Sequence, residues 1–72
     1  MEFLLVQFNP ADRRDVLSSG NVIGQTDTEL LLEAGVYHIS LSGGHYAPPY
    51  WEGMIAGTLV TAPFRIVFTP DA

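Results

Sequence analysis

The residues of this chain that could do chemistry are few. His38 and His45 are its only imidazoles, and it has no cysteine. A metal site in a protein needs several converging ligands at suitable spacing, and the sequence contains no His-x-His or Glu-x-x-His pattern. We therefore expect no metal and no other cofactor, and we interpret both histidines as solvated or edge residues.

A hydrolase would need a nucleophile beside a base and a donor pocket. No serine lies in a Gly-x-Ser-x-Gly elbow. The run Ser42-Gly43-Gly44 lacks the lysine and the following helix of a phosphate-binding loop. The carboxylates of Asp27, Glu29 and Glu33 alternate along one segment, which is typical of a solvated face. The sequence thus predicts a protein that is not an enzyme.

The segment from residue 45 to residue 51 is the candidate binding site. It contains His45, Tyr46, Tyr50 and Trp51, and Pro48-Pro49 stiffens it, which lowers the entropy cost of presenting the rings. Tyrosine and tryptophan combine apolar area with a polar tip and are favoured at interfaces. Three interpretations stay open: packing on the edge of the core, a protein interface, and a carbohydrate or peptide site.

The elements that must position these side chains are all predicted to be strands. No stretch shows helical periodicity, whereas short apolar runs alternate with turn signals. The predicted strands cover residues 3–8, 14–17, 22–23, 30–33, 36–41, 54–60 and 64–68. This pattern predicts an all-β fold, a small antiparallel β-sandwich of about seven short strands with no substantial helix, forming a single domain over residues 1–72.

Two turns set the expected connections. Residues 18–21 have the composition that reverses a chain. Residues 30–33 and 36–41 are expected to form a hairpin in which Gly35 takes a positive φ. The face of the second arm predicted to enter the core consists of Tyr37, Ile39 and Leu41.

The charge balance narrows the range of partners. Three arginines, no lysine and eight acids give a net charge of −5. Nucleic acids and anionic membrane surfaces attract basic proteins, so neither is an expected partner. The acidic start Met1-Glu2 and the polar Gln7 are not those of a secretory signal. A complete chain of this kind is expected to be cytoplasmic, and an excised domain carries no such expectation.

The apolar content predicts self-association or a protein partner. Charged residues make up 15% of the chain and hydrophobic residues 47%. Residues 3–8 are apolar on both faces of the predicted strand, and no lysine is present to protect an edge strand from pairing. We expect a homodimer or a larger assembly whose interface uses Leu4, Val6 and Phe8, with a monomeric glycan- or peptide-binding module as the alternative.

A set of glycine-centred motifs then stands out. They are Val16-Leu17-x-x-Gly20, Gly24-x-Thr26, Leu30-x-Leu32-x-x-Gly35-x-Tyr37-x-Ile39-x-Leu41 and Gly44-x-Tyr46. Their order resembles the PEGA domain, and Gly57-Thr58 with Phe64-x-Ile66-x-Phe68 fits its final strands. The resemblance implies a small β-sandwich related to prealbumin-like and carboxypeptidase-regulatory-like domains. It also implies a non-catalytic module of the kind attached to larger bacterial or archaeal surface proteins, and it brings no catalytic residue.

Overall fold

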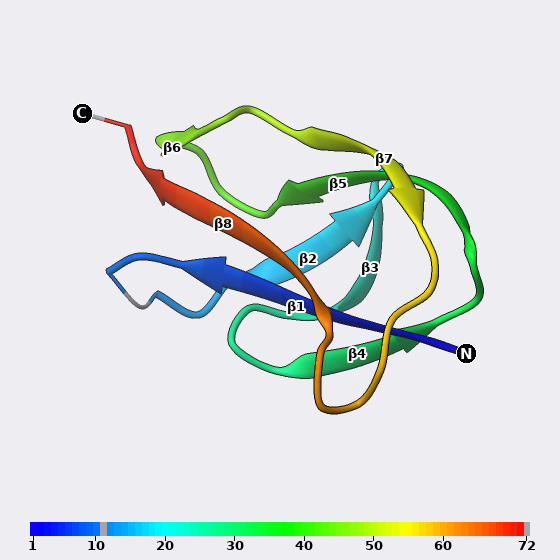
Figure 1. The fold of residues 1–72 in the computed structure, drawn as a ribbon. Helices are drawn as coiled ribbons and strands as arrows, with labels where there is room; N and C mark the ends of the chain where they lie inside the picture. Colours follow the sequence, from blue (N-terminus) through cyan, green and yellow to red (C-terminus); the bar gives the residue numbers. More distant parts are fainter. Residues whose placement is uncertain (11, 72) are drawn as a thin grey trace.

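In the part of the chain that the structure describes, eight strands form two layers (Figure 1). The computed structural model describes residues 1–10 and 12–71. The strands are β1 (Glu2–Phe8), β2 (Asp15–Ser18), β3 (Asn21–Gln25), β4 (Glu29–Leu32), β5 (Gly35–Leu41), β6 (Tyr46–Ala47), β7 (Trp51–Ile55) and β8 (Phe64–Pro70). The predicted all-β sandwich is confirmed, and the eighth strand is the two-residue β6.

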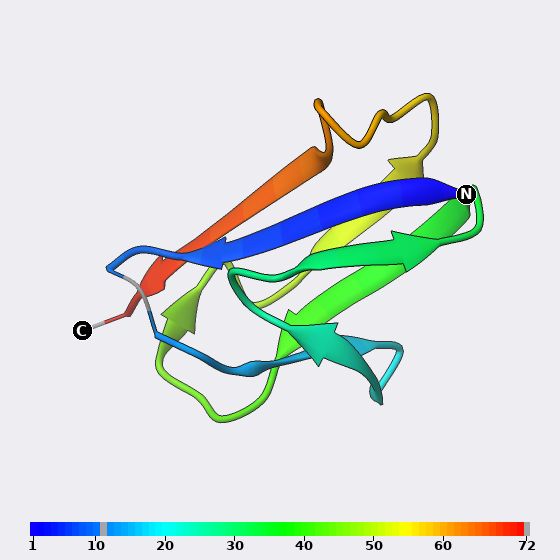
Figure 2. The same cartoon turned by 90° about the horizontal axis from the view of Figure 1, so that it is seen from below.

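Each layer is a four-stranded sheet. One has the order β4-β1-β8-β6 and the other the order β3-β2-β5-β7, and Figure 2 shows the two layers facing each other. Neighbouring strands are antiparallel, with the exception of β1 and β8, which run parallel. The expectation of purely antiparallel pairing is wrong for this pair. A parallel pair needs a long connection, and here almost the whole chain separates the first strand from the last.

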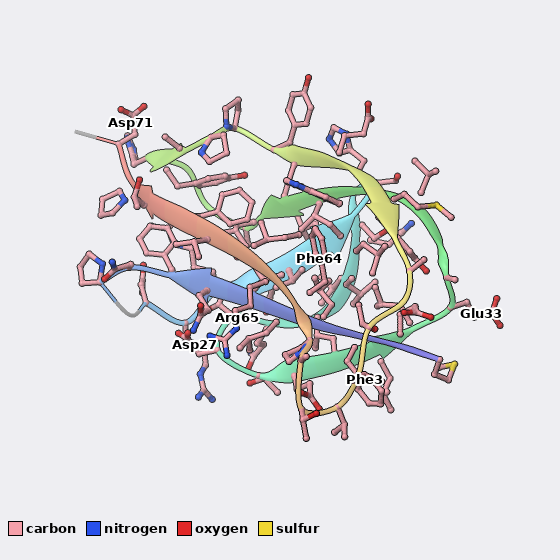
Figure 3. The ribbon with its side chains drawn as sticks, in the orientation of Figure 1. Phe3, Asp27, Glu33, Phe64, Arg65 and Asp71 are labelled. Atoms are coloured by element: carbon pink, nitrogen blue, oxygen red, sulfur yellow. The ribbon has the colours of Figure 1, made fainter. Side chains whose placement is uncertain are left out.

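The core lies between the sheets, because alternate residues of each strand point to the same face. Its buried apolar residues are Leu4, Val6, Phe8, Val16, Leu30, Leu32, Ile39, Leu41, Ile55, Ile66 and Phe68. Partly buried side chains close its rim, and Figure 3 shows Phe64 in the middle of the molecule and Glu33 at its periphery. The predicted core face of β5 is confirmed, since Ile39 and Leu41 are buried and Tyr37 is partly buried against the core.

The predicted interface on the first strand is wrong. Leu4 and Val6 are 0% exposed and Phe8 is 4% exposed, so no second molecule reaches them in this fold. The second sheet covers this face of β1, and the half-buried Phe3 and Leu5 lie on the opposite face. Because β1 is an inner strand of its sheet, outward side chains of β4 and β8 lie on either side of Phe3 and Leu5 and leave them half-buried.

The predicted hairpin between residues 30–33 and 36–41 is also wrong. β4 pairs with β1, whereas β5 pairs with β2 and β7, so the connection at Glu33 crosses from one sheet to the other. Gly35 is not among the residues with positive φ. Two short strands with one apolar face each can bury those faces by packing across the sandwich. A hairpin requires the same alternating pattern, so the sequence does not distinguish the two arrangements.

The turn between β2 and β3 is confirmed. Ser19 has a φ of 49° and Gly20 a φ of 88°, and the flanking strands pair directly. Two positive φ values in a two-residue loop match the right-handed twist of the strands that it joins.

β7 lies earlier in the sequence than the strand that was predicted over residues 54–60. It spans Trp51–Ile55, so Trp51 belongs to a strand and residues 56–60 do not. The following connection folds back on itself through a bridge between Leu59 and Ala62 before β8 begins.

Candidate interaction surface

The outer side of the β5–β7 pair carries five apolar, aromatic and charged side chains that could contact a partner. In the antiparallel register Val36 lies opposite Met54 and His38 opposite Glu52. Tyr37 and Ile39 point toward the core, so Val36 and His38 point outward. Tyr50 directly precedes β7. We call the set Val36, His38, Tyr50, Glu52 and Met54 the β5–β7 face.

His38 organises the polar half of this face. Its ring stacks on the ring of Tyr50, with a centroid distance of 4.5 Å and an interplanar angle of 21°. Its Nδ1 lies 3.2 Å from Oε2 of Glu52, which is within hydrogen-bonding distance. A protonated His38 therefore forms an ion pair with Glu52. The stack and the hydrogen bond hold the imidazole from two sides and restrict its rotamers.

Val36 and Met54 form the apolar half. Val36 is 73% exposed and Met54 is 60% exposed, although the two lie directly opposite each other on adjacent strands. Tyr50 adds a ring that is 49% exposed. An outward apolar pair beside an aromatic residue forms a surface patch. Covering this patch with another molecule is favourable, because apolar area is removed from water.

The three aromatic residues of the predicted binding segment do not share one surface. Tyr46 packs edge-on against Phe68 at 5.4 Å, with its hydroxyl bonded to the backbone of Leu41. The ring of Trp51 lies 5.1 Å from that of Phe64, on the core side of β7. Only Tyr50 remains on the outer face.

His45 lies in the connection that leads from β5 to β6. It is exposed, with a φ of 63°, and its carbonyl oxygen accepts a hydrogen bond from the amide of Asp71 at 2.9 Å. This contact joins the β5–β6 connection to the end of β8. The imidazole that belongs to the candidate surface is instead that of His38.

The sequence contained part of the signal for this surface. Alternation along residues 36–41 places His38 on the outer side, next to Val36. The partners Glu52 and Met54 depend on the register of β5 with β7, which no local pattern specifies.

Arg14 is a structural residue that the sequence analysis did not identify. Its guanidinium carbon lies 4.5 Å from the ring centre of Phe8, and its Nε donates to Oδ2 of Asp12 at 2.9 Å. One of its terminal nitrogens donates to the carbonyl oxygen of Gly44 at 2.7 Å. Arg14 thus joins the β1–β2 connection to the glycine-rich loop after β5.

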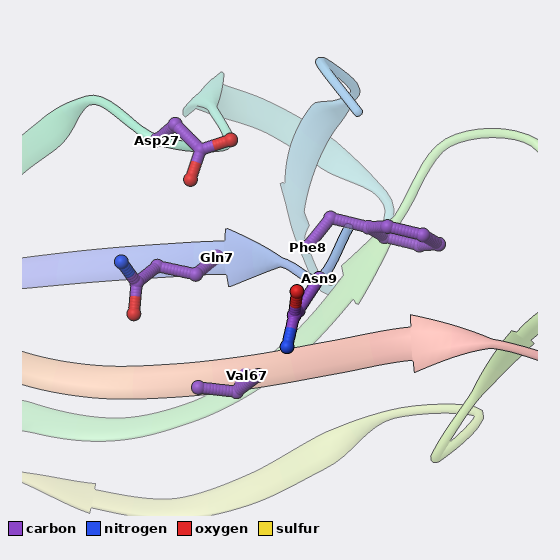
Figure 4. A pocket seen from close by; sticks show the side chains of 5 residues that line it. All are labelled: Gln7, Phe8, Asn9, Asp27 and Val67. Carbon is purple, nitrogen blue, oxygen red and sulfur yellow. The ribbon is translucent and has the colours of Figure 1, made fainter. Parts of the chain in front are cut away.

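A shallow hollow lies at the end of β1. It has a volume of about 360 Å³ and is lined by Gln7, Phe8, Asn9, Asp27 and Val67 (Figure 4). Its polar groups are two side-chain amides and one carboxylate, and its lining has no nucleophilic side chain and no imidazole. This donor set offers hydrogen bonds and contains neither a nucleophile nor a pair of acids for catalysis.

Within residues 1–10 and 12–71, no group of three or more His, Cys, Asp or Glu side chains is placed to hold a metal ion. The same residues include no helix with the length and apolar character needed to cross a membrane.

No protein-family model matches this chain, and comparisons with curated proteins and with solved structures return no match either.

Proposed function

We propose that this chain is a PEGA-like, non-catalytic interaction module whose β5–β7 face contacts another protein chain. The observation that carries the proposal is the exposed pair Val36 and Met54 beside the stacked rings of His38 and Tyr50. Covering such a valine or methionine side chain completely contributes roughly 1.5 to 3 kcal/mol. Tyrosine is enriched among the residues that dominate binding energy at interfaces.

The outer face of the other sheet is a weaker candidate. Its central residue Leu5 lies between Glu29 on β4 and Arg65 on β8, both of them exposed. Covering Leu5 would also desolvate a carboxylate and a guanidinium, which costs free energy unless a partner supplies matching charges. The β5–β7 face carries a single carboxylate, and His38 already lies beside it.

The positions that carry the PEGA resemblance have structural roles, which supports this part of the proposal. Gly20 occupies the positive-φ turn, and a Cβ on Gly24 would collide with the side chain of Leu30. Thr26 is fully buried and bonds the backbone on either side of Arg13. These three residues therefore serve the fold, as the resemblance implies for its motifs.

The proposal is tested by measuring self-association, because a second copy is the first partner to examine. We expect Met54→Glu to weaken association, since it places a charge in the centre of the β5–β7 face. Val67→Glu is the matched control, because Val67 is 50% exposed on the outer face of the other sheet. Amide chemical shifts recorded over a concentration series should change along β5 and β7. Equal behaviour of the two variants would contradict the proposal.

Tyr50 supports a second candidate, a glycan or extended-peptide site. Its ring is half exposed, and His38 stacks on one of its faces, so the opposite face could stack on a sugar. Ring proton resonances of Tyr50 and His38 should then shift when a glycan or peptide panel is added. An unchanged spectrum with every member of the panel would exclude the glycan or peptide site and leave the protein–protein contact as the remaining candidate.

A further inference from the structure

We infer that the chain forms a symmetric dimer in which β7 pairs antiparallel with β7 of a second copy, with Gly53 on the two-fold axis. This inference rests on the proposed function in that it uses Glu52 and Met54 of the β5–β7 face, and it names a second copy as the partner and the edge of β7 as the place of contact. The β3-β2-β5-β7 sheets of the two copies would join into one continuous eight-stranded sheet. Three observations lead to it: the direction of the backbone groups of β7, the state of the other sheet edges, and the residues that the symmetric register brings together.

The backbone direction of β7 follows from hydrogen bonds around β5. The carbonyl oxygen of His38 accepts from the amide of Ser19, so His38 turns its backbone groups toward β2. The amide of Leu41 instead donates to the Tyr46 hydroxyl on the opposite side of the strand. Successive residues of a strand alternate in this respect. Tyr37 and Ile39 therefore direct their backbone groups to β7.

Their partners on β7 are fixed by the register. Tyr37 lies opposite Gly53 and Ile39 opposite Trp51, so these β7 residues bond to β5. By alternation, Glu52 and Met54 turn their N–H and C=O groups outward. β7 pairs with no other strand in the described chain, which leaves these groups free to pair with another strand.

The other edges carry features that oppose pairing. β6 has only two residues, and the β2–β3 pair contains a register shift of the kind that bends and twists a strand. β4 contains Glu29 and is flanked by Asp27 and Glu33. Two copies of β4 would bring these carboxylates together in a molecule that already carries a net charge of −5. β7 has no such protection beyond Glu52.

The Gly53-centred register suits two copies of β7. It places Glu52 of each copy opposite Met54 of the other, where their outward N–H and C=O groups pair, and it places Trp51 opposite Ile55. Shifting the register to centre on Glu52 would set two carboxylates directly opposite each other, which is destabilising. Gly53 on the axis has no Cβ, so the backbones approach there without steric conflict.

The dimer should be weak. The edge of β7 comprises five residues, so the contact is below the roughly 1,000 Å² expected of a stable interface. Association therefore has to be measured by sedimentation equilibrium over about a hundredfold concentration range reaching about 1 mM, where weak complexes are populated.

Proline substitutions test the backbone pairing. Glu52→Pro removes an outward amide, together with the side-chain contact to His38, and leaves the β5–β7 backbone hydrogen bonds intact, because proline is tolerated where the N–H faces away from the sheet. We expect the dimer dissociation constant to rise about tenfold or more, since each of the two copies loses a donor.

The matched control is Leu31→Pro on β4. The carbonyl oxygen of Val6 accepts from the amide of Asp27 on the β4 side, so Leu4 also faces β4 and bonds to Leu30. Leu31 therefore directs its amide outward, as Glu52 does, on an edge that we expect to stay unpaired. Leu31→Pro should leave the dissociation constant unchanged.

Charge substitutions at Met54 test the register. Met54→Glu should abolish the dimer, because it faces Glu52 of the second copy. Met54→Lys should preserve or strengthen it by forming an ion pair with that carboxylate. In wild-type protein the amides of Glu52 and Met54 should become more protected from hydrogen exchange as concentration rises, and that of Leu31 should not.

The outcomes separate the inference from the proposed function. Equal losses with Met54→Lys and Met54→Glu, together with normal association of Glu52→Pro, would overturn the edge pairing and leave the β5–β7 face as the contact. A wild-type protein that stays monomeric up to about 1 mM would overturn the dimer altogether.

Discussion

The hydroxyl of Tyr46 forms two hydrogen bonds with the backbone of Leu41. It donates to the carbonyl oxygen at 3.0 Å and accepts from the amide at 3.1 Å. These bonds supply the backbone of Leu41 with a partner where β5 leaves its pairing with β7. The Tyr46 ring also packs edge-on against Phe68. The same side chain therefore joins the end of β5 to the β8 side of the core.

Tyr46→Phe should destabilise the fold while preserving the packing of the ring. The partly buried backbone groups of Leu41 lose their partner, which costs about 1 to 3 kcal/mol. Urea unfolding followed by Trp51 fluorescence measures the change in the free energy of unfolding. Tyr50→Phe is the control, because Tyr50 is half exposed and water can replace its contacts. Equal effects of the two variants would contradict this role for Tyr46.

Thr26→Val should also destabilise the fold. The Thr26 hydroxyl accepts from the amide of Arg14 at 3.0 Å and donates to the carbonyl oxygen of Asp12 at 2.9 Å, and the side chain is 0% exposed. Valine keeps the shape but leaves both backbone groups without a partner, at a cost of about 1 to 3 kcal/mol. Thr26→Ser keeps the hydroxyl and loses one methyl group, worth about 0.8 kcal/mol. A greater loss for serine than for valine in chemical denaturation would refute the role of the hydroxyl.

The stability of the protein should fall in acid through Glu2. The amide and the hydroxyl of Thr58 donate to Oε1 of Glu2 at 2.9 and 2.7 Å, and these bonds lower the pKa of that carboxyl from 4.5. Because the pKa is lower in the folded state, the unfolded chain binds the proton more readily. The contribution is complete above pH 4.5 and is lost as pH falls through the folded-state pKa.

Thermal melts from neutral to acidic pH test this contribution. Glu2→Gln should lower the melting temperature at neutral pH and converge with wild type in acid. Thr58→Val should reduce the pH dependence only in part, because it removes the hydroxyl donor to Glu2 and keeps the backbone amide, which is the larger cause of the lowered pKa. It should also destabilise the fold at every pH, since the amide of Phe3 loses the hydroxyl to which it donates. If the melting temperatures of wild type and Glu2→Gln differed by the same amount at every pH, the proposed contribution of Glu2 would be ruled out.

Gly24→Ala should destabilise the sandwich through a clash. A Cβ at this position would overlap the buried side chain of Leu30, which belongs to the facing sheet. Overpacking of this kind costs about 1 to 3 kcal/mol. Gly44→Ala is the control, since no atom lies within 4 Å of its added Cβ and its φ is not positive. A calorimetric melting temperature that drops equally for both would show that the Gly24–Leu30 approach is unimportant.

The local sequence determined most of the strands, the β2–β3 turn and much of the core, but neither β6 nor the bounds of β7. Alternation identified Ile39 and Leu41 as inward-facing, and the composition of residues 18–21 required a reversal. These features depend on side-chain periodicity and backbone preference within a few residues, and both are properties of the sequence itself.

Tertiary structure decided the rest. Whether β4 pairs with β5 or packs across from it, and which face of β1 the second sheet covers, depends on contacts between residues far apart in the chain. The same holds for the partners of His38, since only the register of β5 and β7 brings Glu52 beside it. Strand pairing exchanges equivalent backbone groups, so an apolar alternating run fits several partners equally well. The sequence therefore determined most of the elements and the class of fold, and the packing of one sheet on the other determined which apolar side chains remain exposed for a partner.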